Sequence, residues 1–258
     1  MKRKFFYCLL LSFAVVGLSH AQTFVLVHGA WHGGWCWKEV AKELQAQGAE
    51  VYTPTLSGLG EHQNVLDTNI NLETHIQDIV NFINMQDLHD VILVGHSYAG
   101  AVIAGVADRI PARLKKLIFL DAMLIENGKS ALTSQPANLS DNVRAATASS
   151  NGLSVPVWSP EVFGVTDPAQ IKWVSERLTP QPFRSFDQTL SLKHVYGNHL
   201  PLTYIACTKP QMAQLKVFGD KTKSSKDWSY YELPTGHDAM ITMPKELTAL
   251  LYKISQVQ

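Results

Sequence analysis

The sequence contains little cysteine, no excess of either charge and no repeat or low-complexity tract. Its three cysteines in 258 residues are too few and too widely spaced for a disulfide framework or a zinc site of cysteines. Lys plus Arg and Asp plus Glu each number 22, so the basic excess that a general nucleic-acid binder needs is missing. The composition, 46% hydrophobic and 17% charged, is typical of a globular protein. The sequence leaves open whether Cys36 pairs with Cys207.

The N-terminal residues predict a secretory signal peptide over residues 1–21. A basic KRK segment precedes an almost wholly apolar run over residues 5–18, and the SHA that follows has the small-x-small pattern of a cleavage site. That run is too short to span a bilayer comfortably, so no stable membrane insertion is expected. The alternative is a buried N-terminal helix or strand. Cleavage near Ala21 would leave a protein exported to the periplasm or secreted.

Apolar runs alternate with helix-length amphipathic segments, which predicts an α/β fold. The runs are continuous rather than alternating, as in strands buried on both faces of a parallel sheet covered by helices. We therefore expect a mainly parallel sheet of about six strands with helices on both faces. The predicted strands are residues 23–27, 50–54, 91–94, 117–120, 202–206 and 229–233, and the predicted helices are residues 37–47, 72–85, 98–110 and 244–254.

The regular pattern breaks over about residues 123–200, where Pro, Ser and Asn are frequent. A structureless loop of this length is improbable in a compact domain. We interpret this segment as a helical cap inserted after the fourth strand, over the sheet edge where open α/β folds bind their ligands. Residues 22–258 are therefore expected to form a single domain with one insertion.

The strongest functional motif is VGHSYAG at residues 94–100, between a predicted strand and a predicted helix. This is the context of a nucleophile elbow, in which Ser97 would sit in a strained turn with its hydroxyl exposed. Gly95 and Ala99 are the small residues that let strand and helix approach each other. Ala99 departs mildly from the glycine of the strict motif. The alternative is a coincidental tight turn.

A glycine-rich segment, HGAWHGGW at residues 28–35, follows the first predicted strand. Acyl transfer needs N–H donors directed at the developing oxyanion, and a loop in this place supplies one while the residue after the nucleophile supplies the other. We assign the backbone amides of Ala30 and Tyr98. His28 and His32 have the spacing of a metal pair, but that needs a helix and the glycines favour a loop, so no metal site is predicted.

His237, in the sequence TGHD after the last predicted strand, is the best candidate for the general base. In this architecture the base follows the final strand and must reach the nucleophile. The other histidines fit worse, because they lie beside the elbow, in the second strand–helix unit or in the cap.

These motifs identify a family resemblance. FVLVHGAWHGGWCW, GHSYAG and TGHDAM, in this order and spacing, resemble the plant-type esterase and hydroxynitrile lyase branch of the α/β-hydrolases. The resemblance covers nearly the whole chain after residue 21 and implies an α/β-hydrolase fold with a Ser–acid–His triad and no cofactor. The lyases of the branch usually carry Thr in place of Gly29 and Lys in place of Asp238, so this chain is more similar to the esterases.

The acid of the triad departs from the plant pattern. Plant members usually have an Asp after the strand that follows the cap, but residues 204–211 contain no carboxylate. Asp121 ends the fourth predicted strand and keeps the order Ser–acid–His, so it is our first choice. Its alternative role is a structural carboxylate at the start of the cap. Asp220, in an expected solvated turn, is a less favoured acid. Another residue or a defective triad also stays open.

The sequence therefore predicts a serine hydrolase, most simply a carboxylesterase of small or medium apolar esters, with no metal or cofactor. Trp31, beside the expected oxyanion donor, is the best candidate for a substrate-pocket residue, although most aromatics here would serve packing. A lactonase, thioesterase or amidase with the same triad is an alternative. So is a hydrolase-fold binding protein with little turnover. The substrate and the oligomeric state are left open.

Overall fold

The computed structural model describes residues 21–257. All but the last residue of the expected signal peptide lies outside this range, so that assignment remains a prediction. Among the described residues, no helix is both long and apolar enough to cross a membrane.

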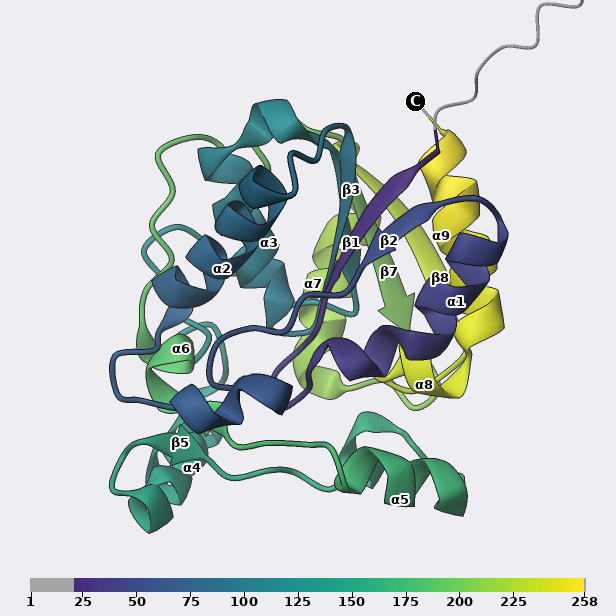
Figure 1. Cartoon of the computed structure of the whole chain (residues 1–258). Coiled ribbons are helices and arrows are strands. Elements are labelled where there is room, and N and C mark those ends of the chain that lie inside the picture. The colour runs from purple at the N-terminus through teal and green to yellow at the C-terminus, as the bar shows by residue number, and fades with distance from the viewer. Residues whose placement is uncertain (1–20, 258) are drawn as a thin grey trace, which may run out of the picture.

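A six-stranded parallel sheet forms the centre of the fold, in the order β2-β1-β3-β4-β7-β8 (Figure 1). The expected sheet is thereby confirmed. Every residue of β3 and four of the five in β1 are buried, which explains why these strands read as continuous apolar runs. The strands are β1 (Thr23–Val27), β2 (Glu50–Tyr52), β3 (Val91–His96), β4 (Leu114–Leu120), β7 (Leu202–Cys207) and β8 (Trp228–Leu233).

Helices cover both faces of the sheet. On one side lie α1 (Lys38–Ala46), α8 (Ala239–Thr242) and α9 (Pro244–Gln256), and on the other lie α2 (Leu72–Met85) and α3 (Ala99–Arg109) (Figure 1). Helix α2 lies at its predicted bounds, and its apolar residues fall on one buried face as their spacing indicates. The structure adds a capping box between Asn71 and Thr74 at its start.

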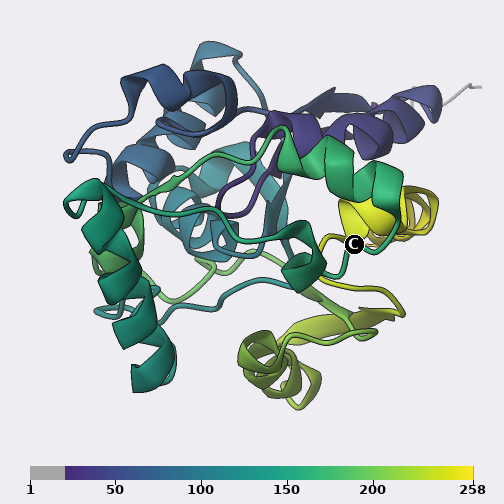
Figure 2. The same cartoon turned by 90° about the horizontal axis from the view of Figure 1, so that it is seen from below.

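The chain between β4 and β7 forms the cap, which lies beyond the carboxyl ends of the strands (Figure 1). Helices α4 (Ala137–Ala146) and α5 (Pro168–Ser175) lie on opposite sides of the cap, as the view from below also shows (Figure 2). The short helix α6 (Phe183–Asp187) contacts α2. The structure adds to the expected helices an antiparallel pair, β5 (Ser154–Val155) and β6 (Gln181–Pro182).

Helix α7 (Ala213–Lys223) connects β7 to β8 and packs against both strands. The sequence interpretation expected a turn around Asp220, and this is wrong. Leu215, Phe218 and Thr222 repeat every three or four residues and bury one face of a helix. Short 3₁₀ helices complete the connections, at Gly34–Trp37, Gly60–Val65, Pro111–Arg113, Thr147–Ser150 and Pro160–Phe163.

Candidate active site

Ser97 lies in a sharp turn between β3 and α3, with a backbone φ of 56°. This left-handed conformation costs a non-glycine residue about 1–3 kcal/mol, so the surroundings must hold it. The Ser97 N–H donates to the carbonyl of Leu120 at 3.1 Å, and the Ser97 carbonyl accepts from the N–H of Met123 at 2.9 Å. A Cβ at Gly95 would come within 2.8 Å of the Ala99 carbonyl oxygen. The strand and the helix therefore approach as closely as the elbow motif requires.

His237 and Asp121 form a buried pair. The His237 Nδ1 and the Asp121 Oδ2 are 2.7 Å apart, although the residues are 116 positions apart in sequence. Asp121 directly follows β4, and the backbone N–H of Cys207 donates to its Oδ1 at 3.2 Å. Both carboxylate oxygens thus accept hydrogen bonds, one from the imidazole and one from the neighbouring strand β7.

Two other carboxylates, Asp220 and Asp238, pair with groups other than His237. Asp220 is exposed on α7 and pairs with Lys216 at 2.6 Å, one helical turn earlier. Asp238 turns away from Asp121, and its Oδ2 lies 3.1 Å from the Nε2 of His32.

The proposed oxyanion loop, residues 28–35, is held by its own side chains. His28 places Nδ1 2.8 Å from the carbonyl oxygen of Gly29 and accepts at Nε2 from the backbone N–H of Leu56 at 3.0 Å. The Nδ1 therefore donates, which fits a neutral imidazole. Burial lowers the pKa of His28 to about 3. The expectation that His28 bonds within the loop agrees with its contact to Gly29.

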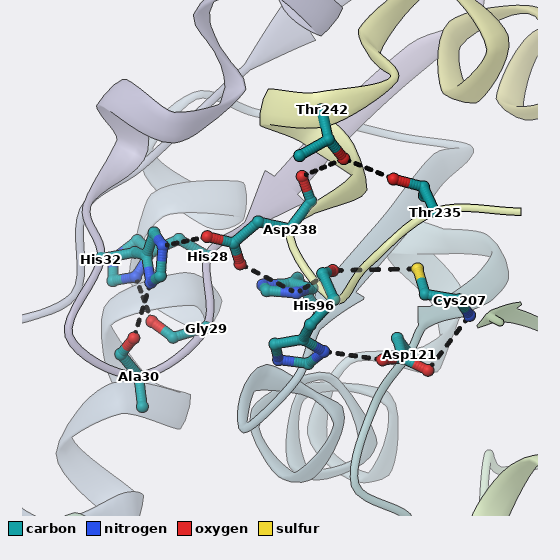
Figure 3. Close-up of polar contacts among 11 residues, drawn as sticks. His28, Gly29, Ala30, His32, His96, Asp121, Cys207, Thr235, Asp238 and Thr242 are labelled. Carbon is teal, nitrogen blue, oxygen red and sulfur yellow. Dashed lines mark hydrogen bonds and ion pairs between the residues drawn. The ribbon is translucent and has the colours of Figure 1, made fainter. Parts of the chain in front are cut away.

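A second buried pair, His32 with Asp238, links the oxyanion loop to the loop of the base (Figure 3). His32 Nδ1 lies 2.7 Å from the Ala30 carbonyl, while Nε2 faces Asp238. Burial alone would lower the pKa of His32, but the charge of Asp238 and the hydrogen bonds to Asp238 and Ala30 raise it above its ordinary value. The Nε2 of His96 lies 3.1 Å from the His237 carbonyl and fixes that loop from the strand side. Sequence reasoning missed the pair of His32 with Asp238, which are 206 positions apart in the chain.

Ser97, His237, Ala30 and Tyr98 line one cavity between the sheet and the cap. Trp31 lines it too, and its ring lies 4.6 Å from that of Trp158 in the cap. Phe163 and Phe186 add further aromatic wall, at 5.7 and 5.8 Å from the Trp31 ring. The structure thus brings together the proposed nucleophile, base, oxyanion amides and pocket tryptophan at one apolar cavity.

Cys36 and Cys207 are both buried and are not bonded to each other. Burial raises the pKa of both thiols, which keeps them protonated and poorly reactive.

Residues 24–250 match the alpha/beta hydrolase family. The chain belongs to this family. A carbendazim hydrolyzing esterase of Nocardioides sp. (strain SG-4G) is 37% identical, with 88% of this chain and 97% of that protein covered. The putative chloroplastic methylesterase 13 of Arabidopsis thaliana is 24% identical over 93% of this chain, which spans 57% of that protein.

Among solved structures, an extracellular alpha/beta-hydrolase from a Paenibacillus species superposes with a TM-score of 0.83 at 27% identity, covering 92% of this chain and all of that one. That hydrolase is described as sharing structural and functional homology with tobacco salicylic acid binding protein 2. The plant-type esterase resemblance is thereby confirmed, and this alpha/beta hydrolase is a carboxylesterase-like enzyme.

Gly29 of this alpha/beta hydrolase leaves no room for a side chain. A Cβ there would lie 2.8 Å from both the His96 Nδ1 and the Ser97 Cβ. We expect Gly29→Ala to displace the elbow, to lower kcat/KM for esters at least about tenfold and to destabilise the fold by about 1–3 kcal/mol. Steady-state kinetics and urea unfolding measure the two effects.

Gly219→Ala is the matched control for Gly29→Ala. Its Cβ would make only ordinary contacts, the nearest at 3.6 Å from the Tyr204 ring, within helix α7. Alanine there should stabilise the helix by up to about 1 kcal/mol and leave activity unchanged. Equal activity in the Gly29 and Gly219 variants would show that the close approach at Gly29 does not matter.

Several buried histidines make the stability of this hydrolase pH-dependent. Burial lowers the pKa values of His28, His75 and His96 below the ordinary 6.5, that of His28 to about 3. Because the unfolded chain takes up these protons first, each contribution is lost as the pH falls below about 6.5. The raised pKa of His32 acts in the opposite direction. We expect a net loss of stability on acidification from pH 7 to pH 5, of which about 2 kcal/mol comes from His28.

Urea unfolding at pH 7, 6 and 5 measures this dependence. His28→Gln retains a donor and an acceptor but does not titrate, so it should remove about 2 kcal/mol of the acid-induced loss. A free energy of unfolding that is constant or rises on acidification would contradict the prediction.

Proposed function

We propose that this alpha/beta hydrolase is a serine carboxylesterase that cleaves small to medium apolar carboxylic esters through an acyl-enzyme. The observation that carries the proposal is the 2.7 Å contact between the His237 Nδ1 and the Asp121 Oδ2 at the cavity that Ser97 lines. A carboxylate in this position fixes the imidazole tautomer, so that the Nε2 is free to accept a proton.

In the proposed reaction the Ser97 Oγ attacks the ester carbonyl while the His237 Nε2 takes its proton. Asp121 stabilises the imidazolium that forms, and the backbone N–H groups of Ala30 and Tyr98 donate to the oxyanion. The imidazolium then gives its proton to the departing alcohol. A water that gives a proton to the His237 Nε2 then attacks the acyl-enzyme. The imidazolium returns this proton to the Ser97 Oγ as the bond between the acyl group and Ser97 breaks and the acid leaves.

The cavity wall supports an apolar substrate. Within the described chain, none of the residues lining it is Lys, Arg, Asp or Glu, and His237 is the only ionisable imidazole among them. A charged acyl or alcohol group would lose its hydration there without an ion partner. The names of the relatives, a carbendazim hydrolyzing esterase and a methylesterase, support an ester as substrate.

We further propose that the enzyme works outside the cytoplasm after cleavage near Ala21, with residues 22–258 as one domain and about 123–200 as its cap. The basic start, apolar run and SHA sequence support export. Strand β1 begins two residues after Ala21, so cleavage there would remove no strand of the sheet. N-terminal sequencing of the protein recovered from the periplasm and the medium tests both the cleavage point and the destination.

The first test of the activity uses p-nitrophenyl acetate and butyrate as substrates and a fluorophosphonate as active-site label. We expect turnover of both esters and a single label on the Ser97 peptide, mapped by mass spectrometry. Labelling without ester turnover would mean an activated serine with another substrate, and lactones, thioesters, amides and carbendazim would then be compared. Neither labelling nor turnover would overturn the proposal.

A further inference from the structure

Gln135, a residue that lines the cavity, carries a buried hydrogen-bond acceptor that has no partner among the described residues. Its side chain lines the same cavity as Ser97 and His237, and its Oε1 is shielded from solvent. Within residues 21–257 no donor bonds to this oxygen. Buried polar atoms are nearly always paired, and each unpaired one is an unfavourable feature that needs an explanation. A ligand that donates a hydrogen bond to the Gln135 Oε1 would explain why this oxygen has no partner within the protein.

The surroundings of Gln135 fix its backbone but offer its side-chain oxygen no donor within the described residues. Its backbone N–H donates to the Leu132 carbonyl at 3.1 Å, and Pro136 begins helix α4 directly after it. Ala131 and Leu139, which line the cavity nearby in the chain, are apolar. The Ser140 hydroxyl also belongs to the lining, but it already donates to the Leu132 carbonyl at 2.6 Å. The backbone is therefore fixed, while the broad terminal torsion of Gln135 leaves the amide free to turn toward a ligand.

We infer that Gln135 is a specificity residue that accepts a hydrogen bond from a neutral hydroxyl or N–H group of the substrate, away from the scissile carbonyl. The inference rests on the proposed esterase function and deepens it. The donor is neutral because no carboxylate lines the described cavity to balance an ammonium group. The preferred substrates are esters that are apolar except for one such donor.

The chemistry also explains how strongly Gln135 would discriminate. A substrate with the donor satisfies the acceptor, whereas a substrate with a methyl group in its place buries the oxygen without a partner. A site that forms a hydrogen bond to a substrate group strongly rejects an analogue without that group. An apolar pocket discriminates much less against an analogue that carries an additional group. For one neutral hydrogen bond at the cavity wall, we expect a preference of about tenfold.

Matched esters measure this preference. Methyl 3- and 4-hydroxybenzoate place the hydroxyl on the acyl side, and 3- and 4-hydroxyphenyl acetate place it on the alcohol side. Each is compared with the ester that carries methyl instead of hydroxyl. The first measurement is the ratio of kcat/KM within each pair. The second is the ratio of dissociation constants for the benzoate esters in the Ser97→Ala background, by calorimetry, which needs no turnover.

The variant Gln135→Met removes the acceptor at nearly constant volume. Gln214→Met is its matched control, because Gln214 lines the same cavity but carries no buried unpaired atom in the described chain. We expect the unmodified protein to favour the hydroxyl ester about tenfold in at least one pair, Gln135→Met to lose that preference, and Gln214→Met to keep it.

Two results would overturn the inference. One is the absence of a hydroxyl preference in every pair with the unmodified protein, which would mean that water satisfies Gln135. The other is a preference that survives Gln135→Met. Binding that discriminates through Gln135 without any ester turnover would support the inference and reject the proposed esterase function, so the two failures are distinguishable.

Discussion

Replacing Ser97 by alanine is expected to lower kcat for p-nitrophenyl esters by about 10⁴- to 10⁶-fold. The change removes only the Oγ that would attack the ester. Alanine keeps the Cβ and meets the same strain at φ 56°, so the turn and its hydrogen bonds to Leu120 and Met123 should persist. The activity that remains would come from the oxyanion amides and the cavity, which do not depend on the hydroxyl.

Two measurements check this prediction together: the midpoint of thermal unfolding and kcat from steady-state kinetics. The midpoint of unfolding should stay within a few degrees of that of the unmodified protein, and fluorophosphonate labelling should disappear. Ser140→Ala removes another hydroxyl from the same cavity, one already bonded to Leu132, and should lower kcat less than about tenfold. Near-normal turnover in Ser97→Ala would reject Ser97 as the nucleophile.

Asp121→Asn should lower kcat by about 10²- to 10⁴-fold, because an amide cannot replace this carboxylate in either orientation. The two carboxylate oxygens accept from two donors, the His237 Nδ1 and the Cys207 N–H. Asparagine has a single oxygen. If its NH₂ faces His237, the wrong tautomer is stabilised, and if it faces Cys207, two buried donors meet at a cost of about 1–3 kcal/mol. In both cases the negative charge that stabilises the imidazolium is lost.

Asp220→Asn is the matched control for this prediction. Asp220 is exposed on α7 and forms an ion pair with Lys216, of a kind that contributes little to stability. Its loss should change kcat less than about twofold. A larger loss of activity in the Asp220 variant than in the Asp121 variant would assign the acid to α7.

Much of the fold could be predicted because single segments determine it. The central strands are buried on both faces and so appear as apolar runs, and α2 has both its cap and its periodic face within residues 71–85. The short strands β5 and β6 have two residues each and no period to detect. Helix α7 was missed around Asp220 because its lysines suggested a solvated turn, whereas its buried face lies on Leu215 and Phe218.

The candidate site likewise contains residues that the sequence could predict and residues that it could not. Ser97 and His237 stand in local motifs. Asp121 could be ranked first because it ends the fourth predicted strand and keeps the order Ser–acid–His, while residues 204–211 contain no carboxylate. The pair of His32 with Asp238 could not be predicted, because it joins the first and last strand–loop junctions of the sheet. The unpaired acceptor of Gln135 depends on which groups fail to reach it, and a sequence carries no local signal for that.

The proposed position of the acid, at the end of β4, has a consequence for how this enzyme could change over evolution. With Asp121 as the proposed acid, the segment after β7, where plant relatives are expected to carry the acid, would be released from catalysis. Met212, Gln214 and Leu215 in that segment nevertheless line the cavity. Mutations there can reshape the substrate range without altering the proton-transfer machinery. Directed evolution toward new esters would therefore best begin with a library restricted to residues 211–215.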